Sequence, residues 1–272
     1  MTGWPGVSEP LEGAKLRVLS LGAGVQSTTL ALMAKHGDIE MPDCAIFADT
    51  GWEPHEVYTH LDWLASVLPF PVHRTRRAGL DLGELTLAVA RGERSQAGNQ
   101  LVPFYTDGGL SPKQCSKEFK TRPVARAIRA MLPEPPKRGC GHIVELLMGM
   151  STDELQRLKV NERPWIRNRY PLVEKHMSRA DCKHWLSERQ YSAPRSACIF
   201  CGYRSKREWA RVLADPEDGP RVLAFDAAIR PLMPSGAFLT PAHKPLAEID
   251  FSEPETGQGD LFANECEGMC AA

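Results

Sequence analysis

The chain has 272 residues, 42% hydrophobic and 25% charged, with a formal net charge of -1. This length and composition allow one large domain, or one domain with an appendage, around a sizeable buried core. No apolar run approaches the roughly 18 residues of a membrane span, and the first residues do not form a signal peptide pattern, so we expect a cytoplasmic protein without a membrane partner. The eight cysteines are too few for a disulfide scaffold and favour metal binding or catalysis in a reducing compartment.

Strands and helices are predicted to alternate in the first part of the chain. Residues 16–21 form a short apolar run typical of a strand, and after a glycine-containing turn a helix is expected up to Gly37. Residues 44–49 predict a second strand, 53–68 a helix and 71–74 a third short strand. This alternation predicts a parallel sheet covered on both faces, with ligands at the carboxyl ends of its strands.

The remainder of the chain is less regular. Residues 81–111 predict an extended loop region around one short helix, and loops of that length often carry function. Helices are expected over residues 122–132 and 178–189, and a buried strand over 143–150. One further helical stretch is expected beyond Pro220.

The turn after the first strand has the features of a phosphate-binding loop. Glycines let backbone N-H groups approach phosphate oxygens, and the following helix directs its positive N-terminus at the same anion. The loop lacks the Lys of a Walker A motif and the third Gly of the dinucleotide fingerprint, and an ordinary strand-to-helix turn is the alternative. The nucleotide-binding residues expected here are Ser20, Gly22, Ala23, Gly24, Gln26, Ser27 and Thr28.

A second group of polar residues follows the second strand. Asp49 is placed at the strand end, where it can hold a ribose hydroxyl or a Mg2+ ion; an Asx turn or a helix cap is the alternative. We count Asp49 among the catalytic residues and, together with Thr50, Gly51 and Glu53, among the nucleotide-binding residues.

These motifs resemble those of a known superfamily. The segment LSLGAGVQSTT looks like the PP-loop of the adenine nucleotide alpha hydrolases: Gly24 and Ser27 match, Gly22 and Ala23 stand where Ser and Gly are usual, and Gln26 replaces the usual Asp. The segment FADTGWEPHEV is similar to the Asp-Thr-Gly motif of the phosphoadenosine phosphosulfate (PAPS) reductase branch. GMSTDELQR and YPLVE resemble two further segments of that branch, in the same order. The resemblance implies a doubly wound, Rossmann-like α/β core that binds ATP or another adenylyl nucleotide and splits it at or near the α-phosphate.

Three cysteines are candidate metal ligands. Cys198 and Cys201 form a C-x-x-C on a predicted turn, and Cys115 lies far upstream among basic residues. Iron-sulfur members of the branch carry a Cys-Cys pair at the upstream place, where this chain has Gln114 beside Cys115. The resemblance thus implies a 4Fe-4S cluster with three cysteine ligands and one open iron, or with a fourth ligand from the tail, for which we take Cys270. Zinc is the rival metal, and free thiols are the third alternative.

The tail offers a second role for cysteine. Reductases of this branch attack their substrate with a cysteine in a C-terminal Glu-Cys-Gly segment, which residues 265–268 match in part. Cys266 and Cys270 are therefore also candidate catalytic nucleophiles.

Two basic segments suggest an anionic partner. Cations with interspersed aromatic rings are typical of surfaces that bind single-stranded nucleic acid, whereas a solvated charged surface or a nucleotide-phosphate site is the alternative. The first segment contains Lys113, Lys117, Lys120, Arg122 and Arg126; the second contains Lys159, Arg163, Arg167 and Arg169 with Trp165 and Tyr170.

We expect an α/β fold with a doubly wound, mostly parallel sheet, a cysteine-rich metal-binding region and a C-terminal tail. Residues 1–210 are assigned to the nucleotide-binding domain and 211–272 to a helical segment with the tail. Three functions remain open: ATP-dependent sulfur transfer to a nucleic acid or nucleotide, reduction of a phosphosulfate nucleotide, and nucleotide binding without turnover around a structural zinc. Expected partners are an adenine nucleotide, tRNA or DNA, a sulfur- or thiol-donor protein and a second copy of the chain.

Overall fold

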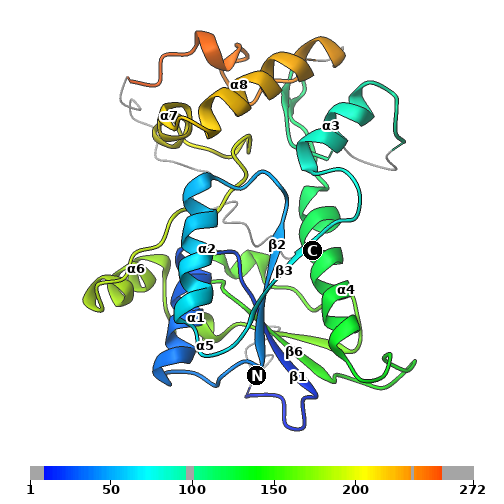
Figure 1. Ribbon diagram of the computed structural model, residues 1–272, viewed down its shortest axis with the longest axis vertical. Helices are drawn as coiled ribbons and strands as arrows, with labels where there is room; N and C mark the ends of the chain where they lie inside the picture. Colours follow the sequence, from blue (N-terminus) through cyan, green and yellow to red (C-terminus); the bar gives the residue numbers. More distant parts are fainter. Residues whose placement is uncertain (1–8, 96–100, 234–235, 253–272) are drawn as a thin grey trace.

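The computed structural model describes residues 9–95, 101–233 and 236–252. Its centre is a five-stranded parallel sheet in the order β3-β2-β1-β6-β7 (Figure 1). The strands are β1 (Leu16–Ser20), β2 (Cys44–Asp49), β3 (Val72–Arg76), β6 (Val144–Met148) and β7 (Ile166–Arg169).

Helices cover both faces of this sheet. On one face α1 (Val25–His36), α2 (His55–Val67) and α6 (Arg179–Glu188) bury the first apolar core, beside the short α5 (Pro171–Glu174). On the other face α4 (Arg122–Met131) packs against β2 and β3. The chain turns from one face to the other between the adjacent strands β1 and β6, so the predicted doubly wound α/β fold is confirmed, and the point where ligands bind in such sheets lies there.

A buried charge stands in the middle of the sheet. The Glu145 side chain in β6 is fully buried, yet it accepts hydrogen bonds from Arg17, from Arg167 and from the Leu11 N-H. Burial alone would raise the pKa of Glu145, but these donors hold it below its ordinary value. These hydrogen bonds and ion pairs offset the cost of burying the Glu145 carboxylate within the sheet.

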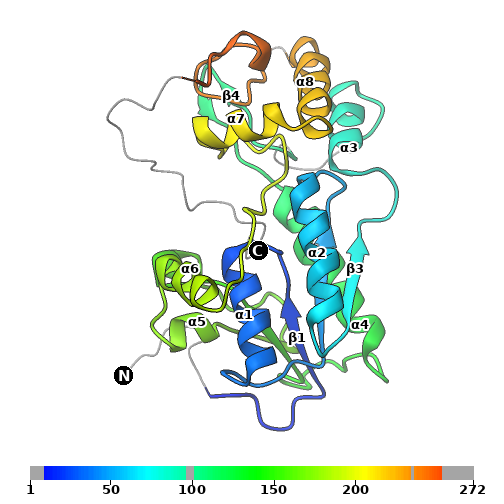
Figure 2. The ribbon, with the colours of Figure 1, turned by 60° about the vertical axis from the view of Figure 1, so that its left-hand side comes forward.

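A second apolar core lies beyond the carboxyl ends of the strands, in the upper part of Figures 1 and 2. It joins α3 (Leu82–Ala90) and residues 101–104 to α7 (Lys206–Ala214) and α8 (Asp218–Ile229). The small β4–β5 hairpin (Tyr105–Thr106, Gly109–Leu110) follows residue 104 directly. Stacked rings of Phe200 and Phe225, with centroids 4.4 Å apart, lie in its middle. Residues before and after position 210 belong to this core. The domain boundary that was expected at position 210 from the sequence stays a prediction.

Short helices complete the described chain. They are the π-helix η1 (Ser116–Thr121) and the 3-10 helices η2 (Thr152–Arg157), η3 (Arg230–Leu232) and η4 (Leu246–Glu248). Residues 81–111 hold α3 and the small β4–β5 hairpin, in agreement with the predicted loop region around one short helix. The elements η1, β7, α5 and α7 were not predicted from the sequence. Within the described residues, no helix combines the length and apolarity needed to cross a membrane.

Candidate functional site

The loop between β1 and α1 is shaped by its backbone. Ala23 has a φ of +56°, a left-handed conformation that is rare outside glycine. At Gly24, a Cβ atom would lie only 3.3 Å from that of Ser196, so the segment before the C-x-x-C packs directly on the loop. Helix α1 starts here without a side-chain cap, which leaves its first-turn N-H groups to bind an anion.

The hydroxyl groups of this loop are bound within the protein. Ser27 Oγ accepts a hydrogen bond from Gly22 N at 3.2 Å and lies 3.3 Å from Gly24 O, to which it donates. Thr28 Oγ1 lies 2.9 Å from Nε2 of His60 in α2. Backbone N-H groups are therefore the donors that the loop can offer to phosphate.

Gln26 ties the loop to the segment after β6. Its Nε2 donates to Ser151 Oγ at 2.8 Å and to Glu154 Oε2 at 2.6 Å. Burial raises the pKa of Glu154, although Arg157 and Gln26 partly offset this. A Cβ at Gly149 would come within 2.8 Å of the Ser27 backbone, so this close packing requires glycine. The segment GMSTDELQR, which resembles a PAPS reductase motif, thus packs against the predicted phosphate loop and hydrogen-bonds to it through Gln26.

Asp49 is held by three neighbours at the end of β2. Its Oδ1 accepts hydrogen bonds from Gly51 N (2.7 Å) and from the Tyr58 hydroxyl (2.8 Å), while Oδ2 pairs with Arg76 of β3. Burial alone would raise the pKa of Asp49, but these donors keep it below its usual value. The contact with Gly51 is the Asx turn that the sequence offered as an alternative. The predicted contact of Asp49 with a ribose hydroxyl or Mg2+ stays a prediction.

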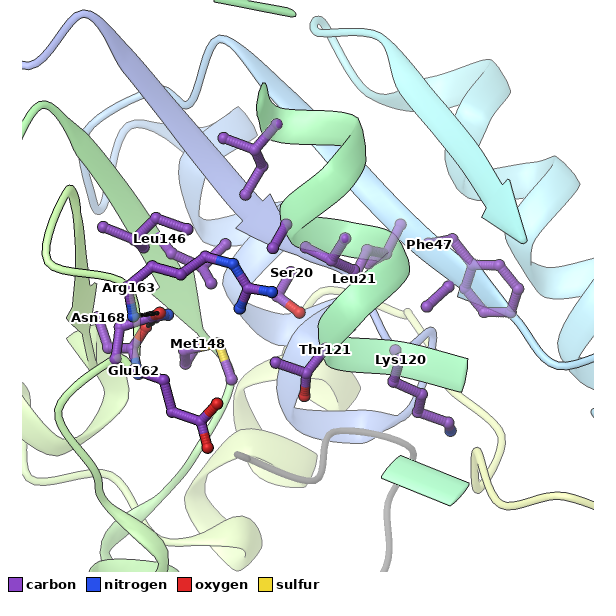
Figure 3. A pocket seen from close by; sticks show the side chains of 17 residues that line it. Ser20, Leu21, Phe47, Lys120, Thr121, Leu146, Met148, Glu162, Arg163 and Asn168 are labelled. Carbon is purple, nitrogen blue, oxygen red and sulfur yellow. Dashed lines mark hydrogen bonds between the residues drawn. The ribbon is translucent and has the colours of Figure 1, made fainter. Parts of the chain in front are cut away.

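A pocket, here called the α4 pocket, opens between α4 and the strand ends (Figure 3). Arg163 enters it from the loop before β7, and Lys120 and Thr121 stand at the start of α4. The remaining wall is mostly apolar, as in sites that bind a base and sugar. Its other principal lining residues are Ser20, Leu21, Gly22, Phe47, Ala48, Val124, Ala125, Ile128, Met148 and Asn168. Of the predicted nucleotide-binding residues, Ser20 and Gly22 lie here.

A second, smaller cavity brings the three candidate cysteines together. Cys115, Cys198 and Cys201 all line it, although 83 residues separate the first two along the chain. Thr50 and Lys120 line the same wall. We call this space the cysteine cavity. The structure thus places the Asp-Thr-Gly segment, the upstream cysteine and the C-x-x-C side by side.

The C-x-x-C turn is held in place by backbone contacts. Cys201 N donates to Cys198 O at 2.9 Å, and Ile199 N donates to Trp52 O at 2.8 Å. The buried Arg204 guanidinium donates to the carbonyl oxygens of Ala197 and Cys198. Arg204 is therefore a structural cation, which orients the turn toward β2.

Glu53 lies behind the lining of the cysteine cavity, in contact with residues that line it, and is 2% exposed. Its Oε1 lies 3.1 Å from Thr50 Oγ1, 3.3 Å from Lys120 Nζ and 3.6 Å from Cys198 Sγ. Its Oε2 is buried, with no hydrogen-bond partner among the described residues. Burial and the nearby Glu53 charge raise the pKa of the Cys198 thiol.

Lys120 lines both the α4 pocket and the cysteine cavity. It lies in the π-helix η1, whose first flanking residue is Cys115. Such π-turns are frequent at functional sites, because they re-aim side chains that an α-helix would place elsewhere. In the sequence, Lys120 and Arg163 stand out only as members of basic segments. Lys113 and Lys117 lie closer to Cys115 than Lys120 does, so no local signal distinguishes Lys120.

No three His, Cys, Asp or Glu side chains of the described residues converge as a ready site for one metal ion. The predicted ligand and nucleophile Cys270, and Cys266, lie outside the described residues. Both roles stay predictions.

Many cations of the basic segments are paired inside the protein. Arg167 and Arg169 bind Glu145, and Arg169 also binds Glu174. Tyr170 is fully buried and donates to Lys159 O, so its ring is closed to a stacked base. The prediction of a tRNA or DNA partner draws no further support from these side chains.

The fold and these two cavities define a doubly wound α/β protein with the predicted phosphate loop at the switch point and a cavity lined by three cysteines. Over 70% of its length the chain is similar to the phosphoadenylyl-sulfate (PAPS) reductase from Candida auris in its phosphate complex, with 18% identity, a TM-score of 0.44 and 78% of that chain covered. No model of a known protein family matches the chain. Nor does any curated protein.

Proposed function

We propose that this chain is an enzyme that binds an adenine nucleotide in the α4 pocket and uses it for sulfur chemistry at the cysteine cavity. The observation that carries the proposal is the position of Lys120, which lines both spaces. A nucleotide phosphate and a cysteine-bound group would therefore share one cation. Charge that develops between them can be stabilised there.

The nucleotide would be held mainly by the backbone and by apolar walls. Its base and sugar would fit between α4 and the ends of β1 and β2, and its phosphates would meet the N-H groups of residues 23–27. Arg163 faces the same pocket and supplies a further positive charge. Both carboxylate oxygens of Asp49 already accept hydrogen bonds. Mg2+ would therefore be held mainly by the nucleotide phosphates and not by Asp49.

The cysteine cavity offers thiolate ligands for an iron-sulfur cluster, with zinc as the rival metal. Each ligand of a 4Fe-4S cluster binds a different iron, whereas the four ligands of a structural zinc surround one ion. Three cysteines from two distant segments line this cavity, and they are the ligands that we assign to the cluster. When bound, such a cluster would supply an iron at which sulfur is held.

ATP-dependent sulfur transfer is the reaction that we favour. The acceptor oxygen would attack the α-phosphorus of ATP with loss of pyrophosphate, and a sulfide sulfur would then displace AMP and take that oxygen's place on the acceptor. Backbone N-H groups of the phosphate loop would bind the leaving pyrophosphate. The cavity holds three described cysteines rather than four, which leaves one coordination place for a group that can exchange.

The second candidate is reduction of a phosphosulfate nucleotide. It is favoured by the tail cysteines Cys266 and Cys270, either of which would attack the sulfur and release the adenosine phosphate, with a thiol donor completing the release of sulfite. The third candidate is nucleotide binding without turnover in a protein with a structural zinc. Such a protein would release neither pyrophosphate nor sulfite.

One set of assays separates the three. Protein purified without oxygen is analysed for iron, sulfide and zinc, then incubated with ATP or with a phosphosulfate nucleotide. Iron with matching sulfide and pyrophosphate release from ATP, in the presence of a sulfide source and candidate acceptors, supports sulfur transfer. Sulfite release supports the reductase, and zinc alone with neither product overturns both.

A further inference from the structure

Glu53, in the turn after β2, contacts three residues that line the cysteine cavity: Thr50, Lys120 and Cys198. We propose that Glu53 supplies the fourth, oxygen ligand of the iron-sulfur cluster, in place of a fourth cysteine. The inference rests on the function proposed above, because it requires that Cys115, Cys198 and Cys201 hold such a cluster.

The two oxygens of Glu53 differ in their surroundings. Oε1 is held by Thr50 Oγ1 at 3.1 Å and by Lys120 Nζ at 3.3 Å. Oε2 is buried and has no hydrogen-bond partner among the described residues. A buried carboxylate oxygen without a donor is costly, and a metal ion is one of the few groups that offset this cost. The orphaned atom is therefore an observation that points to a ligand.

The position of Glu53 agrees with that of a ligand. Its Oε1 lies 3.6 Å from Cys198 Sγ, so the carboxylate already stands beside one thiolate of the set. Ser116 itself lines the cavity, but its hydroxyl would have to lose a proton to bind iron, whereas the Glu53 carboxylate is already anionic. Of these two oxygen donors, Glu53 is the better suited.

An oxygen ligand gives one iron a different character from the other three. Carboxylate is a harder and more readily exchanged ligand for iron than thiolate, so the iron at Glu53 would be the one that opens to sulfur. Glu53 follows β2, and its partner Lys120 also faces the nucleotide pocket. Lys120 would then connect the carboxylate ligand to the nucleotide pocket, and the tail cysteine Cys270 would not be needed as a ligand.

The test compares full-length variants purified without oxygen: Glu53→Gln, Glu53→Cys, Cys270→Ser and the control Glu56→Gln, whose side chain is exposed. Iron and sulfide are counted per chain, and electron paramagnetic resonance after mild oxidation with ferricyanide distinguishes three-iron from four-iron clusters. Melting curves confirm that each variant is folded.

We expect wild type, Glu56→Gln and Cys270→Ser to hold four irons. Glu53→Gln should lose one iron on oxidation about tenfold faster or more. Glu53→Cys should retain four irons and resist that loss, because a thiolate replaces the carboxylate. Equal iron content and equal oxidation rates in wild type and both Glu53 variants would overturn the inference, as would loss of the fourth iron in Cys270→Ser alone. Wild type without any iron or sulfide would instead refute the proposed function.

Discussion

Nε2 of Gln26 donates a 2.6 Å hydrogen bond to Oε2 of the buried Glu154. This contact joins the phosphate loop to the segment after β6, at the position where the resembling PP-loops carry Asp. An Asp at position 26 would place two carboxylates together in a buried site, which explains why an amide suits this chain.

The first prediction concerns this contact. Gln26→Asp should weaken nucleotide binding by about tenfold or more, because the loop must shift to separate two buried carboxylates, a cost on the order of 1–3 kcal/mol. Titration of ATP binding by calorimetry measures the effect. Gln156→Ala is the matched control, since Gln156 is exposed on the same segment. Equal ATP affinity in Gln26→Asp and wild type would show that the contact does not position the loop.

The second prediction separates Lys120 from its neighbour Lys117. Lys120→Ala leaves the buried Glu53 carboxylate without its cation and should cost about 3 kcal/mol of unfolding free energy, and it should also weaken ATP binding. Lys117 pairs with Glu162 on the surface, so Lys117→Ala should cost less than about 1 kcal/mol. Urea unfolding and ATP titration of both variants provide the comparison. Similar losses in the two would contradict the bridging position of Lys120.

The third prediction concerns the metal. Cys198→Ser or Cys201→Ser should remove both the visible absorption of the cluster and the activity, whereas Cys140→Ser, at an exposed thiol, should change neither. Absorption spectra and iron analysis of protein prepared without oxygen measure this. If activity is lost while the cluster is fully retained, Cys198 and Cys201 are not its ligands.

The fourth prediction concerns pH. Burial lowers the pKa of His60 to about 4, from an ordinary value of 6.5. Neutral His60 therefore contributes stability that is present above about pH 6.5 and is lost as the pH falls toward 4, by about 2 kcal/mol at pH 5. His60→Gln should reduce the difference in urea midpoint between pH 7 and pH 5, and the exposed His184→Gln should not. If His60→Gln showed the same difference in urea midpoint between pH 7 and pH 5 as wild type, the loss of stability at low pH would come from other groups.

The centre of the parallel sheet could be predicted because β1, β2 and β6 are mostly apolar. Cys44–Asp49 matched the predicted strand, and the glycines after β1 indicated a phosphate loop, which stays a prediction. Strand β7 was missed because its sequence, IRNR, is polar. Arg167 and Arg169 are there to neutralise Glu145, and that pairing exists only in the folded sheet.

The cysteine cavity was harder to predict from sequence. The C-x-x-C spacing identified Cys198 and Cys201, but the place of Glu53 depends on a turn after β2 that packs against a turn 145 residues later. Likewise, the basic residues near Cys115 looked alike in sequence. The π-helix turns Lys120 inward and leaves Lys117 at the surface, and nothing in the local pattern predicts that difference.

The second core has a consequence for how the protein matures. Its two parts, near residues 80–115 and 197–251, are separated in the chain by α4, β6, β7 and α6. During synthesis Cys115 leaves the ribosome long before Cys198, so the cysteine cavity closes only after the central sheet can already have formed. Insertion of the proposed cofactor would therefore wait for the C-x-x-C segment, and Ser196, just before this segment, also packs on the loop after β1.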